Sequence, residues 1–283
     1  MKLKTKEVIL ISRPRFWMYV LGTFLIGMIA SGNPFQYEGS TVTLLVGLAL
    51  FFSLPANLLI YGVNDIYDYE TDLHNDKKAR YEQLLSPMKH RRLWLIITLL
   101  CVPFLPLLFA INTPTLIGLL VFLFMGLFYS ADPIRAKSKP PLDILFSAII
   151  YVSPAVIGYF ATGSTDLQWL AVFGGLLWAF GMQTYSAIPD IKADKMAGVK
   201  TLATELGERM SLWFCLAAYF ISASIGAYYV GFIAMLLGLI YVVMVILSLS
   251  NSNKLFSYYT YFPLINIVSG ASLFFYLFFT EVL

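Results

Sequence analysis

Long apolar segments alternate with short polar loops along the whole chain, which is the pattern of a protein that crosses a membrane several times. Each segment approaches the roughly 20 residues that a helix needs to span a bilayer. No low-complexity tract or long linker interrupts the pattern, so we expect one domain over residues 1–283. We predict nine transmembrane helices, at residues 15–31, 42–63, 93–111, 114–131, 142–161, 167–188, 211–229, 231–249 and 262–280.

The composition supports this interpretation. Hydrophobic residues make up 59% of the chain and charged residues 12%, against about 45–50% and about 25% in soluble proteins. A soluble core cannot bury so large an apolar fraction. The net charge of +3 is too small to indicate binding to nucleic acid. We therefore expect an all-α integral membrane bundle in contact with membrane lipid, with no nucleic-acid partner.

Basic residues determine the predicted orientation. If the N-terminus is cytosolic, all 19 Lys and Arg residues fall in the inner segments 1–15, 64–92, 130–141, 189–210 and 250–261. Enrichment of Lys and Arg in cytoplasmic loops is the main sequence determinant of orientation. We predict a multi-pass protein of the cytoplasmic membrane, with its N-terminus inside and its C-terminus outside.

A first acidic cluster directly follows the second predicted span. Asn64, Asp68 and Asp72 are spaced by four residues, so a helix that continues past its apolar part carries them on one face, with Asp65 beside them. Like charges at this spacing destabilise a helix by roughly a few tenths of a kcal/mol per pair. A bound cation is the simplest reason to keep such residues together.

A second acidic cluster, Asp190 and Asp194, follows the sixth predicted span with the same spacing. Both clusters come after even-numbered spans, so both are expected to open to the cytosol. Mg²⁺ prefers oxygen ligands and is usually held by one or two carboxylates plus substrate phosphates. We interpret the two helix ends as ligands of two Mg²⁺ ions that clamp a diphosphate. Ordinary solvated helix ends are the alternative interpretation.

Basic residues of the inner segments are candidates for binding that diphosphate. Guanidinium and ammonium groups pair well with phosphate oxygens. The alternative is that they serve only the orientation of the protein, which we accept for the lysines near the N-terminus. The candidates are Lys77, Lys78, Arg135, Lys137 and Lys200.

A few polar side chains extend the acidic faces into the predicted spans. They are Asn57 and Tyr61 in the second span and Gln183 and Ser186 in the sixth. Polar groups at this depth usually face the protein interior, where they contact a substrate or simply cross-link helices. Four aromatic residues are also candidates for the wall of a pocket, where ring faces would stabilise a carbocation. They are Tyr61, Tyr129, Trp178 and Tyr185.

Two prolines lie close to the acidic clusters. Pro55 and Pro189 cannot donate a backbone hydrogen bond, so each is expected to free a carbonyl group and bend its helix. Because Pro189 immediately precedes Asp190, that bend would direct the carboxylate.

The two acidic clusters resemble the aspartate-rich signatures of the UbiA-type intramembrane prenyltransferases. Residues 129–143 resemble the third cytosolic segment of that family, and the similarity extends from Arg13-Pro14 to about Gly207. The resemblance implies a nine-helix bundle and Mg²⁺-dependent transfer of an isoprenyl group from its diphosphate to a lipophilic acceptor. It assigns one ion to Asn64, Asp68 and Asp72, with Asp65 assisting, and the other ion to Asp190 and Asp194.

Residues 55–65, 69–72 and 153–158 are most similar to the bacterial and archaeal lycopene elongases. This similarity implies lycopene, a carotenoid, as the acceptor and dimethylallyl diphosphate (DMAPP) as the donor. Two positions depart from the wider family. Residues 75–78 read Asn-Asp-Lys-Lys where an Asn-Pro-Arg-Lys pattern is expected, and Ser186 stands where quinone-type members carry a tyrosine. Prenylation of an aromatic quinone precursor is therefore the alternative.

Two other classes of membrane protein also carry functional acidic residues. An ion-coupled transporter would place its ligands near the midplane of the bilayer, whereas these clusters lie at one face. A CDP-alcohol phosphotransferase would carry an Asp-Gly-x-x-Ala-Arg sequence, which the chain lacks. The sequence therefore favours a Mg²⁺-dependent prenyltransferase.

Overall fold

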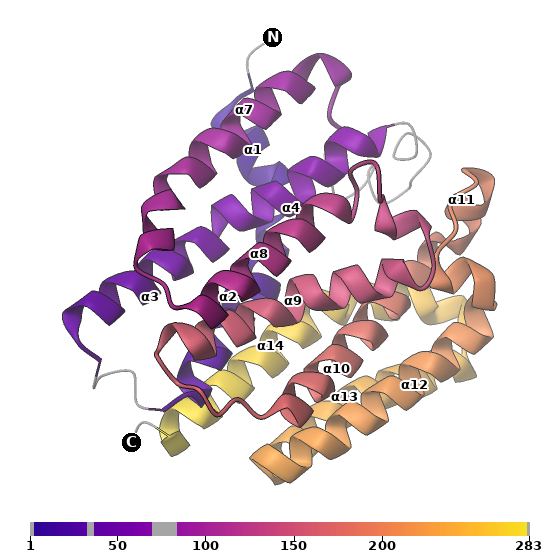
Figure 1. Ribbon diagram of the computed structural model, residues 1–283. Coiled ribbons are helices and arrows are strands. Elements are labelled where there is room, and N and C mark those ends of the chain that lie inside the picture. Colours follow the sequence, from indigo (N-terminus) through magenta and orange to yellow (C-terminus); the bar gives the residue numbers. More distant parts are fainter. Residues whose placement is uncertain (1–2, 33–36, 70–83, 282–283) are drawn as a thin grey trace. The chain divides into compact units, whose positions relative to one another are not determined.

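The computed structural model describes residues 3–32, 37–69 and 84–281, which form α-helices and short 3-10 helices and no strand (Figure 1). The prediction of an all-α protein is confirmed for these residues. The chain forms two compact units, and the single domain remains a prediction. Unit 1 comprises Met1–Arg135, Ser153–Leu167 and Phe274–Leu283, and unit 2 comprises Ala136–Val152 and Gln168–Leu273.

The complete helices of unit 1 are α1 (Thr5–Ile11), α2 (Trp17–Ala30), α3 (Gly39–Phe52), α4 (Leu54–Tyr67), α7 (His90–Cys101) and α8 (Thr113–Phe128). Helix α4 contacts each of the other five (Figure 1). Leu58 and Val63 of α4 belong to a buried apolar cluster with Val8 of α1 and Leu93 and Ile97 of α7. This packing fixes α4, which carries the first acidic cluster at its end.

The helix breaks between α3 and α4, as Pro55 predicts. Helix α3 ends at Phe52, Ser53 has a non-helical ψ of −115°, and α4 begins with Pro55 in its first turn. The side-chain amide of Asn57 donates to the carbonyl oxygens of Phe52 at 3.0 Å and Ser53 at 2.6 Å. Asn57 therefore supports the backbone at the break, where polar groups need partners inside a membrane.

Unit 2 contains α10 (Trp169–Ala187), α11 (Ile191–Met196), α12 (Leu202–Val230) and α13 (Phe232–Ser250), and both units share α9 (Leu142–Ala161) and α14 (Leu255–Glu281). Helix α12 contacts α10, α11 and α13. A Cβ atom added to Gly238 would lie 2.3 Å from the Cβ of Ala223, so α12 and α13 approach closely at these small residues.

Two predicted boundaries in unit 2 are confirmed. Helix α10 ends at Ala187, and a 3-10 turn over Ile188–Asp190 contains Pro189 before α11 begins. Gly231, with a φ of 77°, separates α12 from α13 at the predicted junction of spans seven and eight. A positive φ is readily adopted by glycine, which explains why the two helices end and begin there.

Seven helical segments among the described residues are long and apolar enough to cross a membrane, which supports a multi-pass membrane protein. Helix α8 has 16 residues and is therefore about 24 Å long, shorter than the ~30 Å apolar core of a bilayer. The count of nine spans and the orientation remain predictions. The seven segments are Thr5–Ala30, Gly39–Tyr67, Pro87–Phe109, Leu142–Ala161, Leu202–Val230, Phe232–Ser250 and Ser252–Thr280.

Candidate active site

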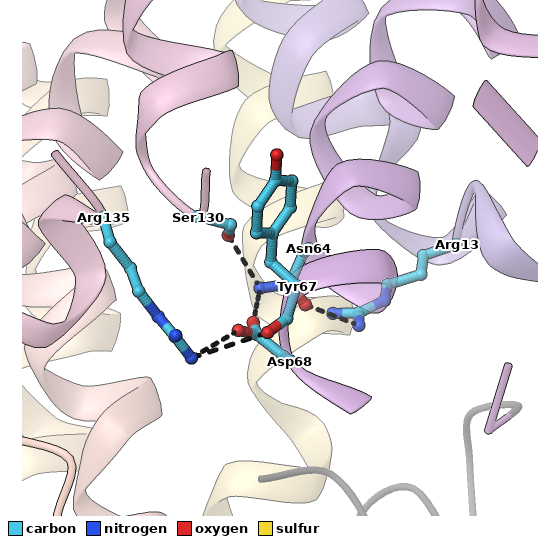
Figure 2. A network of polar contacts seen from close by, with 6 residues as sticks. All are labelled: Arg13, Asn64, Tyr67, Asp68, Ser130 and Arg135. Carbon is cyan, nitrogen blue, oxygen red and sulfur yellow. Dashed lines mark hydrogen bonds and ion pairs between the residues drawn. The ribbon is translucent and has the colours of Figure 1, made fainter. Parts of the chain in front are cut away.

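The first acidic cluster lies at the C-terminal end of α4, where Asn64 and Asp68 are one helical turn apart (Figure 2). The backbone N–H of Asp68 donates to the carbonyl oxygen of Asn64 at 3.0 Å. The Nδ2 group of Asn64 donates to Oδ2 of Asp68 at 2.6 Å and to Oγ of Ser130 at 3.1 Å. The structure thus places Asn64 and Asp68 on one face, with Ser130, which follows α8, against it.

Arg13 reaches the same cluster from the segment between α1 and α2 (Figure 2). Its Nη2 group donates to Oδ1 of Asp65 at 3.0 Å and to Oδ1 of Asn64 at 3.4 Å. Its Cζ atom lies 4.7 Å from the ring centroid of Tyr61. The Asp65 side chain is 4% exposed and that of Arg13 is 14% exposed, so this ion pair is largely shielded from water. Charge-assisted hydrogen bonds of this kind are among the strong ones in proteins.

Arg135 approaches the cluster from the side opposite to Arg13 (Figure 2). Its Nη2 group lies 3.5 Å from Oδ1 of Asp68 and 3.5 Å from the carbonyl oxygen of Tyr67. The Arg135 side chain is 33% exposed, whereas that of Asp68 is 2% exposed. Both contacts are at the long limit for a hydrogen bond. Arg135 therefore contacts the cluster at a longer distance than Arg13 does, and its side chain is more exposed.

Both arginines have a left-handed backbone conformation. The φ angle is 51° at Arg13 and 45° at Arg135, and no other non-glycine residue in the described ranges has a positive φ. Such a conformation costs on the order of 1–3 kcal/mol for a residue other than glycine, and it tends to persist at functional sites. Arg13 and Arg135 both have this strained conformation, and both place a cation against the first acidic cluster. This combination indicates a functional site at that cluster.

The donor atoms of this cluster fit Mg²⁺ in their chemistry, because carboxylate and amide oxygens are the ligands that this ion prefers. In the structure the Nδ2 group of Asn64 faces Asp68, so an ion shared by the two residues requires the amide to turn. Within residues 3–32, 37–69 and 84–281, no three His, Cys, Asp or Glu side chains lie close enough together to hold a metal. Asp72, the third predicted ligand, lies outside these ranges.

The other predicted residues of unit 1 differ in their surroundings. Asn57 is fully buried, and its Oδ1 atom has no hydrogen-bond partner among the described residues. Tyr61 is buried with its ring centroid 5.8 Å from that of Phe16. Tyr129 directly follows α8 and is half-buried. Lys77 and Lys78 lie outside the described residues, so their binding to the diphosphate remains a prediction.

The second acidic cluster begins in the 3-10 turn that contains Pro189. Asp190 ends that turn and Asp194 lies on α11, and both side chains are half-buried. The Oε1 atom of Gln183 accepts a hydrogen bond from Oγ of Ser147 at 2.8 Å, which links α10 to α9. This hydrogen bond is a helix cross-link of the kind that the sequence allows for Gln183, and its contact with a substrate remains a prediction.

The two predicted lysines of unit 2 lie in the segments that precede α9 and α12. Lys137 is half-buried in the turn Ala136–Ser138, and Lys200 is exposed directly before α12. The buried carboxylate of Asp143, on the first turn of α9, accepts the backbone N–H of Leu202 through Oδ2 at 2.7 Å. This contact holds the start of α12 to α9 and so restricts the position of Lys200.

The pattern of acidic clusters does not identify Arg13 or Asp143 as site residues. Arg13 meets Asp65 across 52 positions, and Asp143 meets Leu202 across 59 positions, so the contacts depend on tertiary structure. One signal points to Arg13, because it is a cation within the apolar segment Thr5–Ala30. Charged residues in such segments usually face the protein interior and have a partner there.

Replacing Arg13 by Ala is expected to lower the free energy of unfolding by about 1.5–3 kcal/mol, the usual contribution of a hydrogen bond to a charged group. The substitution removes the ion pair between Arg13 and the buried carboxylate of Asp65. The thermal midpoint of the detergent-solubilised protein measures the effect, and Arg92→Ala, at an exposed position of α7, is the control. Equal midpoints for the two variants would show that the Arg13 contact does not stabilise the cluster.

Comparison with known proteins finds relatives over most of the chain. The sequence profile of the UbiA prenyltransferase family matches residues 20–263. A lycopene elongase/hydratase of Haloarcula japonica is 36% identical over 263 residues, which are 92% of this chain and 87% of that protein. A lycopene elongase/hydratase of Corynebacterium glutamicum is 30% identical over 225 residues, which are 78% of this chain and 76% of that protein.

Solved structures share the fold. A UbiA homologue from Archaeoglobus fulgidus bound to GPP and Mg²⁺ superposes with a TM-score of 0.70 at 20% identity, covering 96% of this chain and 99% of that one. The same homologue bound to DMAPP and Mg²⁺ gives a TM-score of 0.66 at 19% identity, covering 95% and 99%. At these identities the likeness establishes a common fold and nothing further.

Proposed function

Because the chain belongs to the UbiA prenyltransferase family, we propose that this enzyme transfers an isoprenyl group from DMAPP to lycopene and so lengthens the C40 carotenoid to C45 and C50 products. The similarity to lycopene elongase/hydratases carries the proposal, since it reaches 36% identity over 92% of the chain. As an enzyme that transfers prenyl groups, the protein is not an ion-coupled transporter.

We propose that Asn64, Asp68 and Asp72, assisted by Asp65, hold one Mg²⁺ ion and that Asp190 and Asp194 hold another. The all-oxygen donor set at the end of α4 supports this assignment. The structures of the Archaeoglobus fulgidus homologue bound to GPP and Mg²⁺ and to DMAPP and Mg²⁺ support it as well. When bound, the ions supply Lewis-acid stabilisation of the departing diphosphate.

Arg135 is suited to neutralise the diphosphate as its bond to carbon breaks. Its contact with Asp68 is long at 3.5 Å and its side chain is 33% exposed, so a phosphate oxygen can replace that contact. Arg13 is a positioning residue, because it holds Asn64 and Asp65 in place. Preorganised charges of this kind are usually the largest contribution to catalysis. Lys77, Lys78, Lys137 and Lys200 are proposed to pair with the same diphosphate.

In the proposed reaction the allylic C–O bond of the donor breaks and its electron pair leaves with the diphosphate. The π electrons of a terminal double bond of lycopene then form the new C–C bond. The resulting tertiary cation either loses a proton or binds water and then loses a proton. Asn57, whose buried Oδ1 has no partner among the described residues, and Tyr61 are proposed to orient this water or receive the proton. Tyr129 and Gln183 are proposed to contact the prenyl chains.

An aromatic acceptor has less support from the residues near the second cluster. Ser186 occupies the position where quinone-type members carry a tyrosine. The neighbouring Tyr185 is fully buried, and its hydroxyl group forms a hydrogen bond with Oγ of Ser248 at 2.9 Å. This hydroxyl links α10 to α13. An unfunctionalised polyene needs no such polar partner, because its own double bond is the nucleophile.

Expression of the protein in a lycopene-producing host tests the proposal. We expect lycopene to be converted to C45 and C50 carotenoids that mass spectrometry of lipid extracts separates by mass. The matched control is Asp68→Asn, which keeps the shape of the side chain but removes its charge, and which should leave lycopene unchanged. Unchanged lycopene with the native enzyme, together with a prenylated hydroxybenzoate or naphthoate, would establish the quinone-type alternative.

The proposed topology places both acidic clusters on the cytosolic side, because every Lys and Arg residue falls in the inner segments. In a variant with Cys101 and Cys215 replaced by Ala, a cysteine at the exposed position Asp132 should resist a membrane-impermeant thiol reagent in intact cells. A cysteine at the exposed position Thr165 should be labelled. Labelling at position 132 but not at position 165 would show that the topology is the inverse of the one proposed.

A further inference from the structure

Unit 2 contains a pocket of about 470 Å³ beside α11. It lies between the bend at Pro189, helix α11, the start of α12 and the turn Ser252–Lys254 that joins α13 to α14. The proposed transfer reaction gives this pocket no role. The lining residues that bear on its chemistry are Ile188, Lys192, Lys195, Glu208, Ser252 and Leu255.

Charged side chains form the rim of the pocket. Lys192 and Lys195 are exposed, and neither ammonium group forms a hydrogen bond or ion pair with another residue in the described part of the chain. The carboxylate of Glu208 accepts a hydrogen bond from the hydroxyl group of Ser252. Two ammonium groups and one carboxylate leave the rim with a net charge of +1. This charge complements a ligand group that carries a single negative charge.

The floor of the pocket is apolar. Ile188 and Leu255 are buried, at 4% and 5% exposure, and Phe256 lies beside them on α14. Residues of two candidate membrane spans, Leu202–Val230 and Ser252–Thr280, line the pocket near the start of each span. A cationic rim above an apolar floor at the ends of membrane helices suits an amphipathic ligand better than a fully hydrated ion.

The rim lysines do not share a face of α11 with the second acidic cluster. Successive residues of a helix are about 100° apart, so Ile191, Lys192 and Lys195 fall within one sector of roughly 100°. Asp194 falls outside that sector. Neither Asp190 nor Asp194 lines the pocket, so its lining does not include the carboxylates assigned to Mg²⁺.

We propose that this pocket binds the headgroup of an anionic membrane phospholipid, with its single phosphodiester charge between Lys192 and Lys195 and its upper acyl chain against the apolar floor. Basic pockets between transmembrane helices commonly bind anionic lipid headgroups. Glu208 disfavours ligands of higher negative charge, such as inorganic diphosphate, by repulsion. The lipid would steady α11, which carries Asp194.

Native mass spectrometry of the purified protein tests the proposal. The protein in detergent is titrated with phosphatidylglycerol or with phosphatidylcholine of the same acyl chains. We expect the native protein to bind phosphatidylglycerol more tightly, and the double variant Lys192→Gln/Lys195→Gln to weaken that binding about 30-fold, since each lysine near a membrane surface contributes about a fivefold preference. Arg91→Gln/Arg92→Gln, which removes two exposed cations from α7, is the matched control and should bind as the native protein does.

Glu208→Gln gives a test that loss of folding cannot imitate, because it should strengthen the binding of phosphatidylglycerol by removing the only acid of the pocket rim among the described residues. Equal binding of the two lipids by the native protein would overturn the proposal, and so would unchanged binding in the lysine variant. Displacement of phosphatidylglycerol by millimolar inorganic phosphate or diphosphate would identify a site for a free anion instead. None of these outcomes depends on prenyl transfer.

Discussion

Asp68→Ala is expected to reduce turnover at least about a thousandfold, because one side chain is assigned both to the metal and to the position of Arg135. Asp68 is 2% exposed and contacts Asn64 at 2.6 Å and Arg135 at 3.5 Å. Its loss removes a carboxylate that is proposed to bind Mg²⁺, and it releases the guanidinium group that is proposed to neutralise the diphosphate. The measurement is the rate of prenyl transfer by the purified variant at saturating Mg²⁺.

The control for this variant is Asp132→Ala, which removes an exposed acidic residue from the segment between α8 and α9. It should retain the native rate. Circular dichroism of both variants should show native helix content, because the cluster lies at the end of α4 and not within its apolar packing. An Asp68→Ala enzyme with native Mg²⁺-dependent turnover would remove this cluster from the active site.

Asp190→Ala is expected to reduce turnover by about a hundred- to a thousandfold. Unlike Asp68→Ala, it should also change the Mg²⁺ concentration that the enzyme needs. If Asp190 and Asp194 hold an ion of their own, the variant should need a higher Mg²⁺ concentration for half-maximal rate. A Mg²⁺ titration of the rate measures this shift. Glu205→Ala, which removes an exposed acidic residue from α12, should leave the titration unchanged.

A slower Asp190→Ala enzyme with a native Mg²⁺ requirement would show that the two clusters have different roles. In that case the second cluster would act on the substrate without holding metal. A native rate at all Mg²⁺ concentrations would exclude Asp190 from the site altogether.

Much of the fold could be predicted from local patterns. The break at Pro55, the bend at Pro189 and the boundary at Gly231 all lie where the sequence places them, because each depends on the backbone chemistry of one residue. The shared face of Asn64 and Asp68 follows from helical spacing alone. The number of spans is harder to predict from the sequence than these breaks are. It depends on where apolar helices such as α8 begin and end, which no single residue specifies.

The contacts that complete the site could not be predicted in the same way. Arg13 meets Asp65 through the packing of α1 against α4, which no local pattern specifies. The sequence left two roles open for Asn57 and Gln183. The structure shows a structural hydrogen bond for each, at the break before α4 and between α10 and α9. The Oδ1 atom of Asn57, which has no partner among the described residues, is the observation that supports the catalytic role proposed for Asn57.

A reconstituted reaction tests directly whether the enzyme transfers an isoprenyl group from DMAPP to lycopene. The purified enzyme in lipid vesicles is supplied with lycopene, DMAPP and Mg²⁺, and released diphosphate is measured together with the carotenoid products. We expect one diphosphate for the C45 product and two for the C50 product, with neither formed when Mg²⁺ is chelated. Diphosphate release without any lengthened carotenoid, or prenylation of an aromatic acceptor in its place, would contradict this expectation.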